Sequence, residues 1–162
     1  MSAAENYTKA LDLKPHPEGG YYRETYRSAG IFQGSGGFPE GRNYSTAIYY
    51  LLQQNDISHF HRIRSDEAWF FHDGDGLRIH LLEKDQYKKV TLGLNLNIGE
   101  QPQFVVGHGA WFAAELVNKQ GFGLVSCTVS PGFDFSDFEM MTRQQFESSF
   151  VQYSNLEHLV NE

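Results

Sequence analysis

The chain has 162 residues, of which 40% are hydrophobic and 15% aromatic, and its formal net charge is −7. A chain of this length and composition can bury one core, so we interpret residues 1–162 as a single domain and exclude a disordered chain. The acidic balance, without a cluster of Lys and Arg, argues against nucleic acid or an anionic membrane as a partner.

Cysteine usage and the start of the chain indicate the compartment. Cys127 is the single cysteine, so an intrachain disulfide is excluded and a reducing environment is favoured. Its apolar surroundings in sequence favour a buried structural thiol over a nucleophile. The first six residues do not resemble a signal peptide, and no apolar stretch approaches the ~20 residues of a membrane helix. We therefore expect a cytoplasmic protein without membrane contact.

The chain opens with a predicted short helix from Ala3 to about Leu13, which the Pro- and Gly-rich segment 14–20 ends. The glycine-rich segment 30–42 is predicted to be a loop. Short runs rich in aromatic and β-branched residues alternate with turns, as strands do. They span residues 21–28, 45–52, 58–63, 67–72, 77–82, 87–92, 103–106, 110–117 and 122–130.

Nine such strands without alternating helices predict an antiparallel sandwich or barrel. The end of the chain differs, because Thr142 to Gln145 has the pattern of a capping box. Phe146, Phe150 and Tyr153 then follow at helical spacing. We therefore predict an amphipathic helix over about residues 142–160 that packs on the barrel or on a second subunit.

The segment His59-Phe60-His61, followed by Glu67, contains the most informative residues. Side chains alternate faces on a strand, so His59 and His61 are expected to point the same way. Glu67 opens the next predicted strand and can converge on the same point. Two histidines and a carboxylate form a metal-ligand set, and the same three groups also suit acid–base chemistry without a metal.

The order His59-x-His61, Glu67, Gly74 also resembles the first motif of the cupin superfamily, with one extra residue before the Glu. The second cupin motif corresponds to Gly107 to Phe112, where Phe112 occupies the position of a metal-ligand His. Four further segments resemble one cupin branch, catalogued as domain of unknown function 985. They are His16 to Tyr26, Thr46 to Leu52, His61 to Glu67, and Thr128 to Phe135.

This resemblance covers about residues 13–138 and implies an all-β cupin jelly-roll β-barrel with short N-terminal and C-terminal helices. The implied barrel is similar in shape to dTDP-sugar epimerases and is assembled as a homodimer or a larger homo-oligomer. The aromatic excess of the chain agrees with such contacts. The branch has no established activity, and fold analogy does not supply one.

In such a barrel His59, His61 and Glu67 face the interior, together with Trp69 and Phe71 at two-residue spacing. The set fits a small-molecule pocket, which is apolar with a few convergent polar groups. One interpretation is a divalent metal ion, such as iron, manganese, nickel or zinc, held by His59, His61 and Glu67. Phe112, which removes the usual fourth ligand, argues against it.

A second interpretation is a pocket that requires no cofactor. There His61 acts as a general base, and Tyr50 or Tyr22 supplies the acid, similar to epimerase-type cupins. A purely binding pocket and a barrel that serves only assembly are further alternatives. The expected ligand is a sugar, a nucleotide-sugar or an organic acid, and isomerase or epimerase chemistry is favoured over metal-dependent oxidation.

Two flanking segments also bear on the pocket. Glu18 and Glu24 can reach its mouth, and Arg23 can bind an anionic ligand; the alternative is an edge strand whose charges lie in water. Pro131 to Phe135 is a turn with aromatic residues, which is predicted to close the end of the barrel, cover a neighbouring subunit or gate the pocket.

Overall fold

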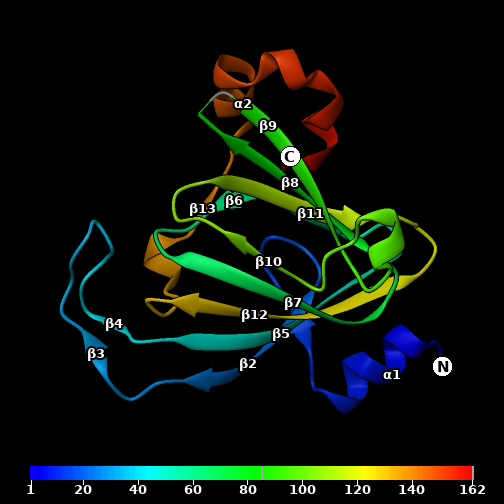
Figure 1. The fold of residues 1–162 in the computed structure, drawn as a ribbon, viewed down its shortest axis with the longest axis horizontal. Coiled ribbons are helices and arrows are strands. Elements are labelled where there is room, and N and C mark those ends of the chain that lie inside the picture. The colour runs from blue at the N-terminus through cyan, green and yellow to red at the C-terminus, as the bar shows by residue number, and fades with distance from the viewer. Residues whose placement is uncertain (85, 162) are drawn as a thin grey trace.

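In the computed structural model, residues 1–84 and 86–161 are described, and antiparallel strands dominate the fold (Figure 1). The nine predicted strands are confirmed, and their ends differ from prediction by at most two residues. They are β2 (Tyr21–Arg27), β5 (Thr46–Gln53), β6 (Ile57–Arg62), β7 (Asp66–Gly74), β8 (Leu77–Glu83), β9 (Gln86–Leu92), β10 (Gln103–Val106), β11 (Trp111–Leu116) and β12 (Phe122–Ser130).

Four two-residue strands extend this framework, and they are too short for a pattern search to find. They are β1 (Lys14–Pro15), β3 (Ile31–Phe32), β4 (Arg42–Asn43) and β13 (Glu139–Met140). β3 pairs with β4, so the segment predicted as a loop is closed at its base by a small ladder. We call residues 31–43 the arm, because they project from the body of the molecule (Figure 1).

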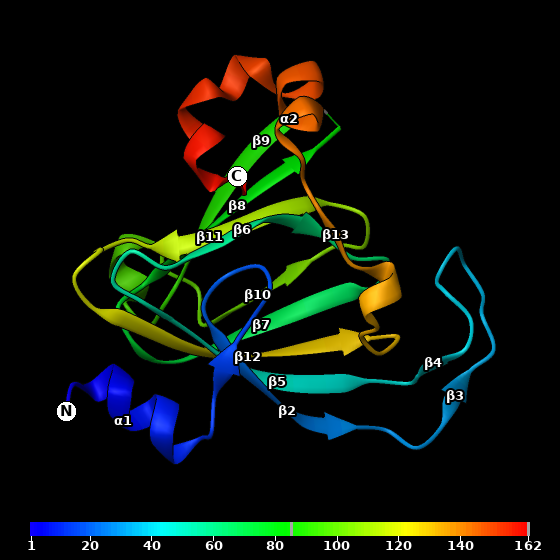
Figure 2. The ribbon, with the colours of Figure 1, turned by 180° about the vertical axis from the view of Figure 1, so that it is seen from behind.

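The strands form two main sheets that face each other (Figures 1 and 2). One sheet has the order β1-β2-β5-β12-β7-β10, and the other has the order β13-β6-β11-β8-β9. Non-consecutive strands lie side by side in both sheets, as the predicted jelly roll requires. Large apolar side chains fill the space between the sheets, among them Trp69, Phe112, Leu52 and Ile79.

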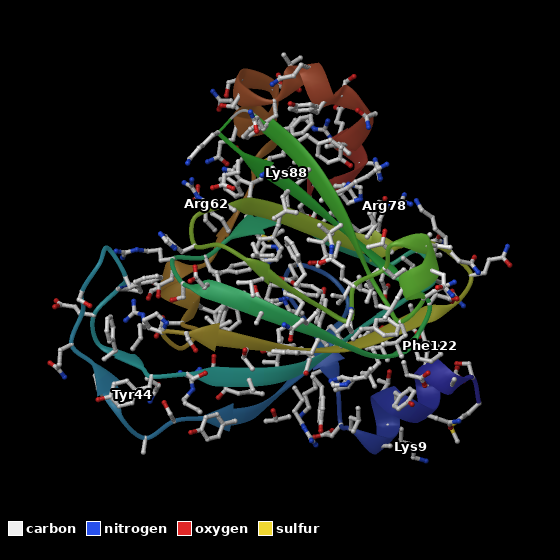
Figure 3. The ribbon with its side chains drawn as sticks, in the orientation of Figure 1. Lys9, Tyr44, Arg62, Arg78, Lys88 and Phe122 are labelled. Carbon is white, nitrogen blue, oxygen red and sulfur yellow. The ribbon has the colours of Figure 1, made fainter. Side chains whose placement is uncertain are left out.

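The outer faces of both sheets are partly covered as well. α1 (Ala3–Ala10) begins with a capping box between Ser2 and Glu5. It covers one end of the six-stranded sheet, next to Phe122 (Figure 3). The ring of Tyr7 lies 5.7 Å from the ring of Phe122, between centroids. The C-terminal helical segments cover the outer face of the five-stranded sheet. Two 3₁₀ turns, η1 (Leu96–Ile98) and η2 (Phe135–Asp137), lie in connections.

The C-terminal helix differs from prediction, because it is two segments instead of one. α2 (Arg143–Ser149) begins with the predicted capping box, and η3 (Val151–Leu159) follows with 3₁₀ geometry and a kink at Tyr153. The apolar positions 150, 153, 156 and 159 are spaced by three, which is the period of a 3₁₀ helix. This geometry therefore keeps them on one side, toward the sheet. None of the described helices is long and apolar enough to cross a membrane.

Candidate active site

A cavity of about 320 Å³ lies between the two sheets, near the base of the arm. Strands β2, β5, β7 and β12 form one wall, β6 contributes to the other, and the connections before β2 and after β12 close it. Its lining combines charged groups with aromatic rings. The lining residues are His16, Glu18, Tyr22, Glu24, Arg27, Thr46, Ile48, His61, Ile63, Glu67, Cys127, Val129, Phe133, Asp134, Phe135 and Phe138.

Glu18 reaches this cavity on the connection from β1 to β2, which rises between the sheets (Figure 2). The backbone N–H of His59 donates to the carbonyl oxygen of Glu18 (2.9 Å) and ties the connection to β6. Gly19 follows with a φ of +112°, and a Cβ there would lie 1.9 Å from the carbonyl oxygen of Ile57. Glycine alone fits this passage, so Gly19 allows a charged side chain to enter the interior.

Glu18 and His61 form a buried ion pair. Oε2 of Glu18 lies 3.0 Å from Nε2 of His61, and Oε1 accepts a hydrogen bond from the Ser58 hydroxyl (2.9 Å). Nδ1 of His61 lies 2.7 Å from the carbonyl oxygen of His59. A carbonyl oxygen only accepts, so Nδ1 carries a proton, and Nε2 needs a second proton to donate to the carboxylate. His61 is therefore an imidazolium in this arrangement.

The pKa shifts of both partners favour the charged pair. Burial raises the pKa of Glu18, but the charge and hydrogen bond of His61, with contributions from His16 and Ser58, lower it to about 2. Burial lowers the pKa of His61, but the carboxylates of Glu18 and Glu67 raise it above its ordinary value. An opposite charge at close range thus outweighs desolvation for each group.

Glu67, on β7, is the second carboxyl group of the interior. Burial raises its pKa, and the negative charge of Glu18 raises it further, to about 7. The positive charge of His61 and the neighbouring Cys127 and Trp69 side chains oppose this shift. The pKa of Glu67 therefore lies near neutral pH, which is the range in which a general acid or base works best.

Two weak donors lie beside the Glu67 carboxyl group. β7 and β12 pair so that Trp69 lies opposite Cys127, and both side chains are buried. Burial and the charge of Glu67 raise the pKa of Cys127, so its thiol keeps the proton. The indole nitrogen of Trp69 lies near enough to lower the pKa of Glu67, yet it makes no hydrogen bond within the described residues. A buried N–H without a partner is uncommon, so this donor is available to an ionised Glu67.

His16 contributes a neutral imidazole to the same cavity. The backbone N–H of Glu18 donates to its Nδ1 (3.2 Å), so the ring proton lies on Nε2. Burial lowers the pKa of His16, the carboxylate of Glu18 opposes this, and the charge of His61 lowers it again. The rings of Tyr22 and Phe138 lie 4.5 Å and 6.0 Å from the His16 ring, between centroids.

The rim of the cavity carries an ion pair between Arg27 and Glu24. Nε and Nη2 of Arg27 donate to the two carboxylate oxygens at 2.9 Å and 2.7 Å. Nη1 donates to Oδ1 of Asn43 (2.9 Å), and Nη2 also donates to the carbonyl oxygen of Phe133 (3.1 Å). The guanidinium therefore joins β2, the base of the arm and the connection after β12.

Of the predicted ligand set, His61 and Glu67 line the cavity, and His59 does not. Nδ1 of His59 lies 2.8 Å from the carbonyl oxygen of Glu18. Its ring therefore contacts the backbone of the connection before β2. Glu18 takes the place beside His61 that the sequence analysis gave to His59.

The expected alternation fails because β6 contains a β-bulge. Phe112 of β11 pairs with His61, but Ala114 pairs with Ser58, so β6 has one residue more than β11 over this interval. An extra residue reverses which side chains face inward. Ser58 and His61 consequently share the interior face, and His59 is displaced from it.

These residues do not fit the metal ion that the cupin pattern implies. The ring of Phe112, at the position of the fourth ligand, lies 4.1 Å from the ring of His61, between centroids. Both nitrogens of His61 already have partners in Glu18 and the His59 carbonyl. Across residues 1–84 and 86–161, no group of three or more His, Cys, Asp or Glu side chains is arranged to hold a metal ion.

The other predicted pocket residues divide between the lining and the core. Tyr22 and Glu24 line the cavity. Trp69, Phe71 and Phe112 belong to the buried core beside or behind it.

Two of the predicted roles need correction. Arg23 lies on the outer face, where its guanidinium carbon is 5.8 Å from the centre of the Tyr49 ring. The hydroxyl of Tyr50 donates to the carbonyl oxygen of Gly19 (2.6 Å), and burial raises the pKa of Tyr50 well above its ordinary value. Tyr50 is therefore a structural donor that holds the connection before β2.

Sequence reasoning missed His16, Arg27 and Ser58 as members of the site. Arg27 faces inward because a second bulge lies between Glu24 and Tyr26 on β2. His16 and Glu18 flank a proline in a segment read mainly as a helix stop. The signal that was available is the pair of titratable groups next to Gly19-Gly20, since glycine permits a close passage into a core.

The comparisons with known proteins agree with this fold. A sequence model of the cupin superfamily, domain of unknown function 985, matches residues 5–141. The uncharacterised protein YML079W of Saccharomyces cerevisiae is 35% identical over 148 residues, covering 84% of this chain and 74% of the yeast protein. A hypothetical protein from Leishmania major is 36% identical with a TM-score of 0.90, and 100% of each chain is covered.

Protein SO0799 from Shewanella oneidensis is 37% identical with a TM-score of 0.90, and 100% of this chain and 99% of that chain are covered. These similarities and the two facing antiparallel sheets confirm the predicted resemblance and fold class. The chain belongs to the cupin superfamily, in the family catalogued as domain of unknown function 985.

Proposed function

We propose that this protein binds a small polar carbonyl compound in the cavity and removes and returns the proton on the carbon next to the carbonyl group, as an isomerase or epimerase does, without a metal ion. One observation carries the proposal: the buried carboxyl group of Glu67 lines the same cavity as the Glu18–His61 ion pair. The pKa of Glu18 is about 2, and the pKa of Glu67 is about 7. Carboxyl groups whose environments separate their pKa values in this way characterise acid–base sites.

Glu67 acts as the base in its ionised form and as the acid in its protonated form. Glu67 in its ionised form removes a proton from the carbon next to the carbonyl group. The electron pair of the broken C–H bond forms a carbon–carbon double bond, and the carbonyl oxygen takes up the displaced pair as an oxyanion, so the step needs no oxidant or reductant. Protonated Glu67 then returns the proton to the same carbon, as in exchange or epimerisation, or to the former carbonyl carbon while the proton of the neighbouring hydroxyl passes to the oxyanion, as in isomerisation. Trp69 and Cys127 stabilise the ionised form of Glu67, and burial stabilises its protonated form.

The negative charge that develops on the substrate oxygen is met by groups that are already fixed in the cavity. The Nε2–H of the neutral His16 supplies a hydrogen-bond donor. The imidazolium of His61 keeps its two N–H groups on Glu18 and the His59 carbonyl oxygen, so it acts through its field and not through a hydrogen bond to the substrate. Preorganised groups of this kind stabilise a transition state strongly in a site that excludes water. His61 thus acts as an electrostatic group, and Glu67 takes the role of base that the sequence analysis gave to His61.

Deuterium exchange tests this proposal directly. The protein is incubated in D₂O with a panel of aldoses and ketoses, and loss of the proton signal next to the carbonyl group is followed by NMR. We expect exchange into at least one member that is unaffected by EDTA, is reduced on the order of 100-fold or more in Glu67→Gln, and is unchanged in Glu83→Gln, an exposed carboxyl outside the cavity.

Exchange that survives in Glu67→Gln, or that disappears on chelation, would contradict the proposal. Binding of a panel member without exchange in the parent protein would instead assign the cavity to a non-catalytic binding protein. His61→Gln separates the role of the base from that of the ion pair, because it leaves Glu67 in place but removes the imidazolium that Glu18 holds. We expect it to lower the exchange rate without preventing binding.

A further inference from the structure

The cationic groups of the cavity all have partners within the protein. His16 is neutral, which leaves His61 and Arg27 as the positive charges of the lining. Nε2 of His61 lies 3.0 Å from Oε2 of Glu18, so its charge is matched by a buried carboxylate. An anionic ligand would have to displace Glu18 from His61 to gain this charge.

Arg27 is occupied even more completely. A guanidinium has five N–H donors, and those of Arg27 make four hydrogen bonds to Glu24, Asn43 and the Phe133 carbonyl oxygen. Arginine recognises phosphate and carboxylate through two parallel N–H donors. Glu24 already takes that pair, so Arg27 has no such pair to offer an incoming anion.

The remaining charges of the lining are negative. Besides Glu18 and Glu24, Asp134 lies at the rim and Glu67 lies inside. Hydrogen bonds from the Ser136 hydroxyl and backbone N–H lower the pKa of Asp134, so it is ionised at neutral pH. The lining therefore has a net charge of −1 when Glu67 is protonated and −2 when it is ionised. Like charges in one cavity repel, so this balance disfavours an anion.

The same lining suits a ligand that donates hydrogen bonds. Carboxylate oxygens are acceptors, and the cavity is richer in them than in free donors. The rings of Phe135 and Phe138 lie 6.2 Å and 6.0 Å from the ring of His16 and add apolar faces. Such a combination of aromatic faces and a few polar groups is typical of small-molecule sites.

On these grounds we infer that the substrate is an uncharged, hydroxyl-rich carbonyl compound, an unphosphorylated sugar, and that the site discriminates against phosphorylated and carboxylated analogues through the Glu24–Arg27 and Glu18–His61 pairs. This inference rests on the proposed function and narrows its ligand, because it excludes the nucleotide-sugars and organic acids that the sequence analysis admitted.

Matched ligand pairs test the inference. Binding of unphosphorylated pentoses and hexoses, of their terminal phosphates and of the corresponding aldonates is compared by saturation-transfer NMR and calorimetry. We expect at least one neutral sugar to bind and its phosphate and aldonate to bind at least tenfold more weakly. A parent protein that binds no neutral sugar, or that prefers the anionic partner, overturns the inference.

A charge variant makes the test independent of the parent's affinity. Glu24→Gln frees the paired N–H donors of Arg27, so this variant should gain at least tenfold in affinity for the phosphate form, and Glu24→Gln/Arg27→Gln should lose that gain. Thermal melting establishes that each variant is folded, and Glu83→Gln is the matched control. If Glu24→Gln gains no affinity for the phosphate form, occupation of Arg27 is not what excludes anions.

Exchange that depends on Glu67 but acts on an anionic sugar would refute this inference and leave the proposed function intact.

Discussion

Two clusters of histidine and carboxylate lie on opposite faces of the five-stranded sheet. The inner cluster joins Glu18, His61 and Glu67 in the cavity. The outer cluster lies beneath η3, where Nε2 of His80 is 3.2 Å from Oε1 of Glu115, and Nε2 of His158 is 3.4 Å from Oε2. The two clusters share the same residue types, so their differences show what distinguishes a candidate active site from a structural contact.

The first difference is the number of carboxyl groups. The outer cluster has Glu115 alone, and Nζ of Lys119 lies 3.3 Å from its Oε2. The hydrogen bond from His80 lowers the pKa of Glu115, burial opposes this, and the charges of Lys119 and His80 lower it further, to about 2. Glu115 is therefore ionised at neutral pH.

The second difference is access. The inner cluster lines a cavity and contains Glu67, whose pKa of about 7 lets it change protonation under ordinary conditions. None of the outer cluster's described members lines that cavity. A His–Glu pair by itself therefore indicates nothing about catalysis. The informative feature is a second carboxyl group, here Glu67, that has no cationic partner of its own and lines the cavity.

Removing the inner ion pair should have the largest effect on stability. In Glu18→Gln, the buried His61 loses the carboxylate that compensates its charge, and breaking one side of a buried pair destabilises by about 3–5 kcal/mol. Urea unfolding at pH 6 measures this, because both partners are charged there. A loss in the free energy of unfolding below about 1 kcal/mol would mean that the pair is solvated.

Glu67→Gln should raise the free energy of unfolding relative to the parent, whereas Glu18→Gln lowers it, and the size of this gain should depend on pH. The pKa of Glu67 is about 7 in the folded protein and 4.5 as its ordinary value. Between these values the folded protein keeps a proton that the unfolded chain releases, so stability falls as pH rises. The parent protein should therefore lose about 3 kcal/mol between pH 4 and pH 8 from this group, and the variant should not.

Urea unfolding of the parent protein and Glu67→Gln across this pH range gives the two curves to compare. The informative quantity is how the difference between the two free energies of unfolding changes from pH 4 to pH 8. The difference at pH 4 alone is not informative, because the amide can change packing at every pH. Curves that stay parallel from pH 4 to pH 8 would show that Glu67 has an ordinary pKa. That result would remove the main support for acid–base chemistry.

The outer cluster should behave as an ordinary structural contact. Glu115→Gln is expected to lower the free energy of unfolding by about 1–3 kcal/mol at pH 7, since hydrogen bonds to a charged group are lost. A depressed pKa stabilises above the unfolded value of 4.5 and loses that effect as pH falls through about 2. The difference from the parent should therefore shrink in acid. Changed sugar binding in this variant would contradict the separation of the clusters.

How much of this could be read from the sequence depends on strand register. Trp69 and Phe71 were correctly placed on the inner face, because β7 alternates without interruption from Glu67 to Phe71. His59 was not, because a bulge in β6 shifts the alternation, and a bulge in β2 likewise hid the inward direction of Arg27. Arg23 precedes the bulge in β2 and faces outward by regular alternation, since Tyr22 and Glu24 on either side of it line the cavity. A one-residue slip moves side chains to the other face of a sheet, and neither bulge contains a glycine that would announce it.

Glu18 illustrates a different limit. Its place beside His61 depends on a hydrogen bond between its carbonyl and the backbone of His59, 41 residues later in the chain. No local pattern encodes such a contact. The 3₁₀ geometry of η3 was not predicted either, but the sequence held a signal for it, since apolar residues spaced by three from Phe150 to Leu159 favour it over an α-helix.

The smallest effect is expected from Trp69, and it tests how Glu67 is tuned. Trp69→Phe keeps an aromatic ring against Tyr50 and Phe112, whose rings lie 5.7 Å and 6.2 Å away, but removes the indole N–H. Since that group lowers the pKa of Glu67, its loss should raise the pKa further, by an amount equivalent to about 1 kcal/mol or less. The ¹³C signal of the Glu67 carboxyl group, assigned with Glu67→Gln, reports the titration.

The matched control for this titration is Trp111→Phe. Trp111 lies on the outer face of β11, where the guanidinium carbon of Arg62 is 4.4 Å from its ring centre. Both substitutions shrink a buried ring and lose packing, so stability alone cannot separate them. A raised pKa in Trp69→Phe and an unchanged one in Trp111→Phe would assign the effect to the indole N–H beside Glu67. An equal shift in both would mean that Glu67 responds to loosened packing, and Trp69 would then belong to the core and not to the proposed acid–base site.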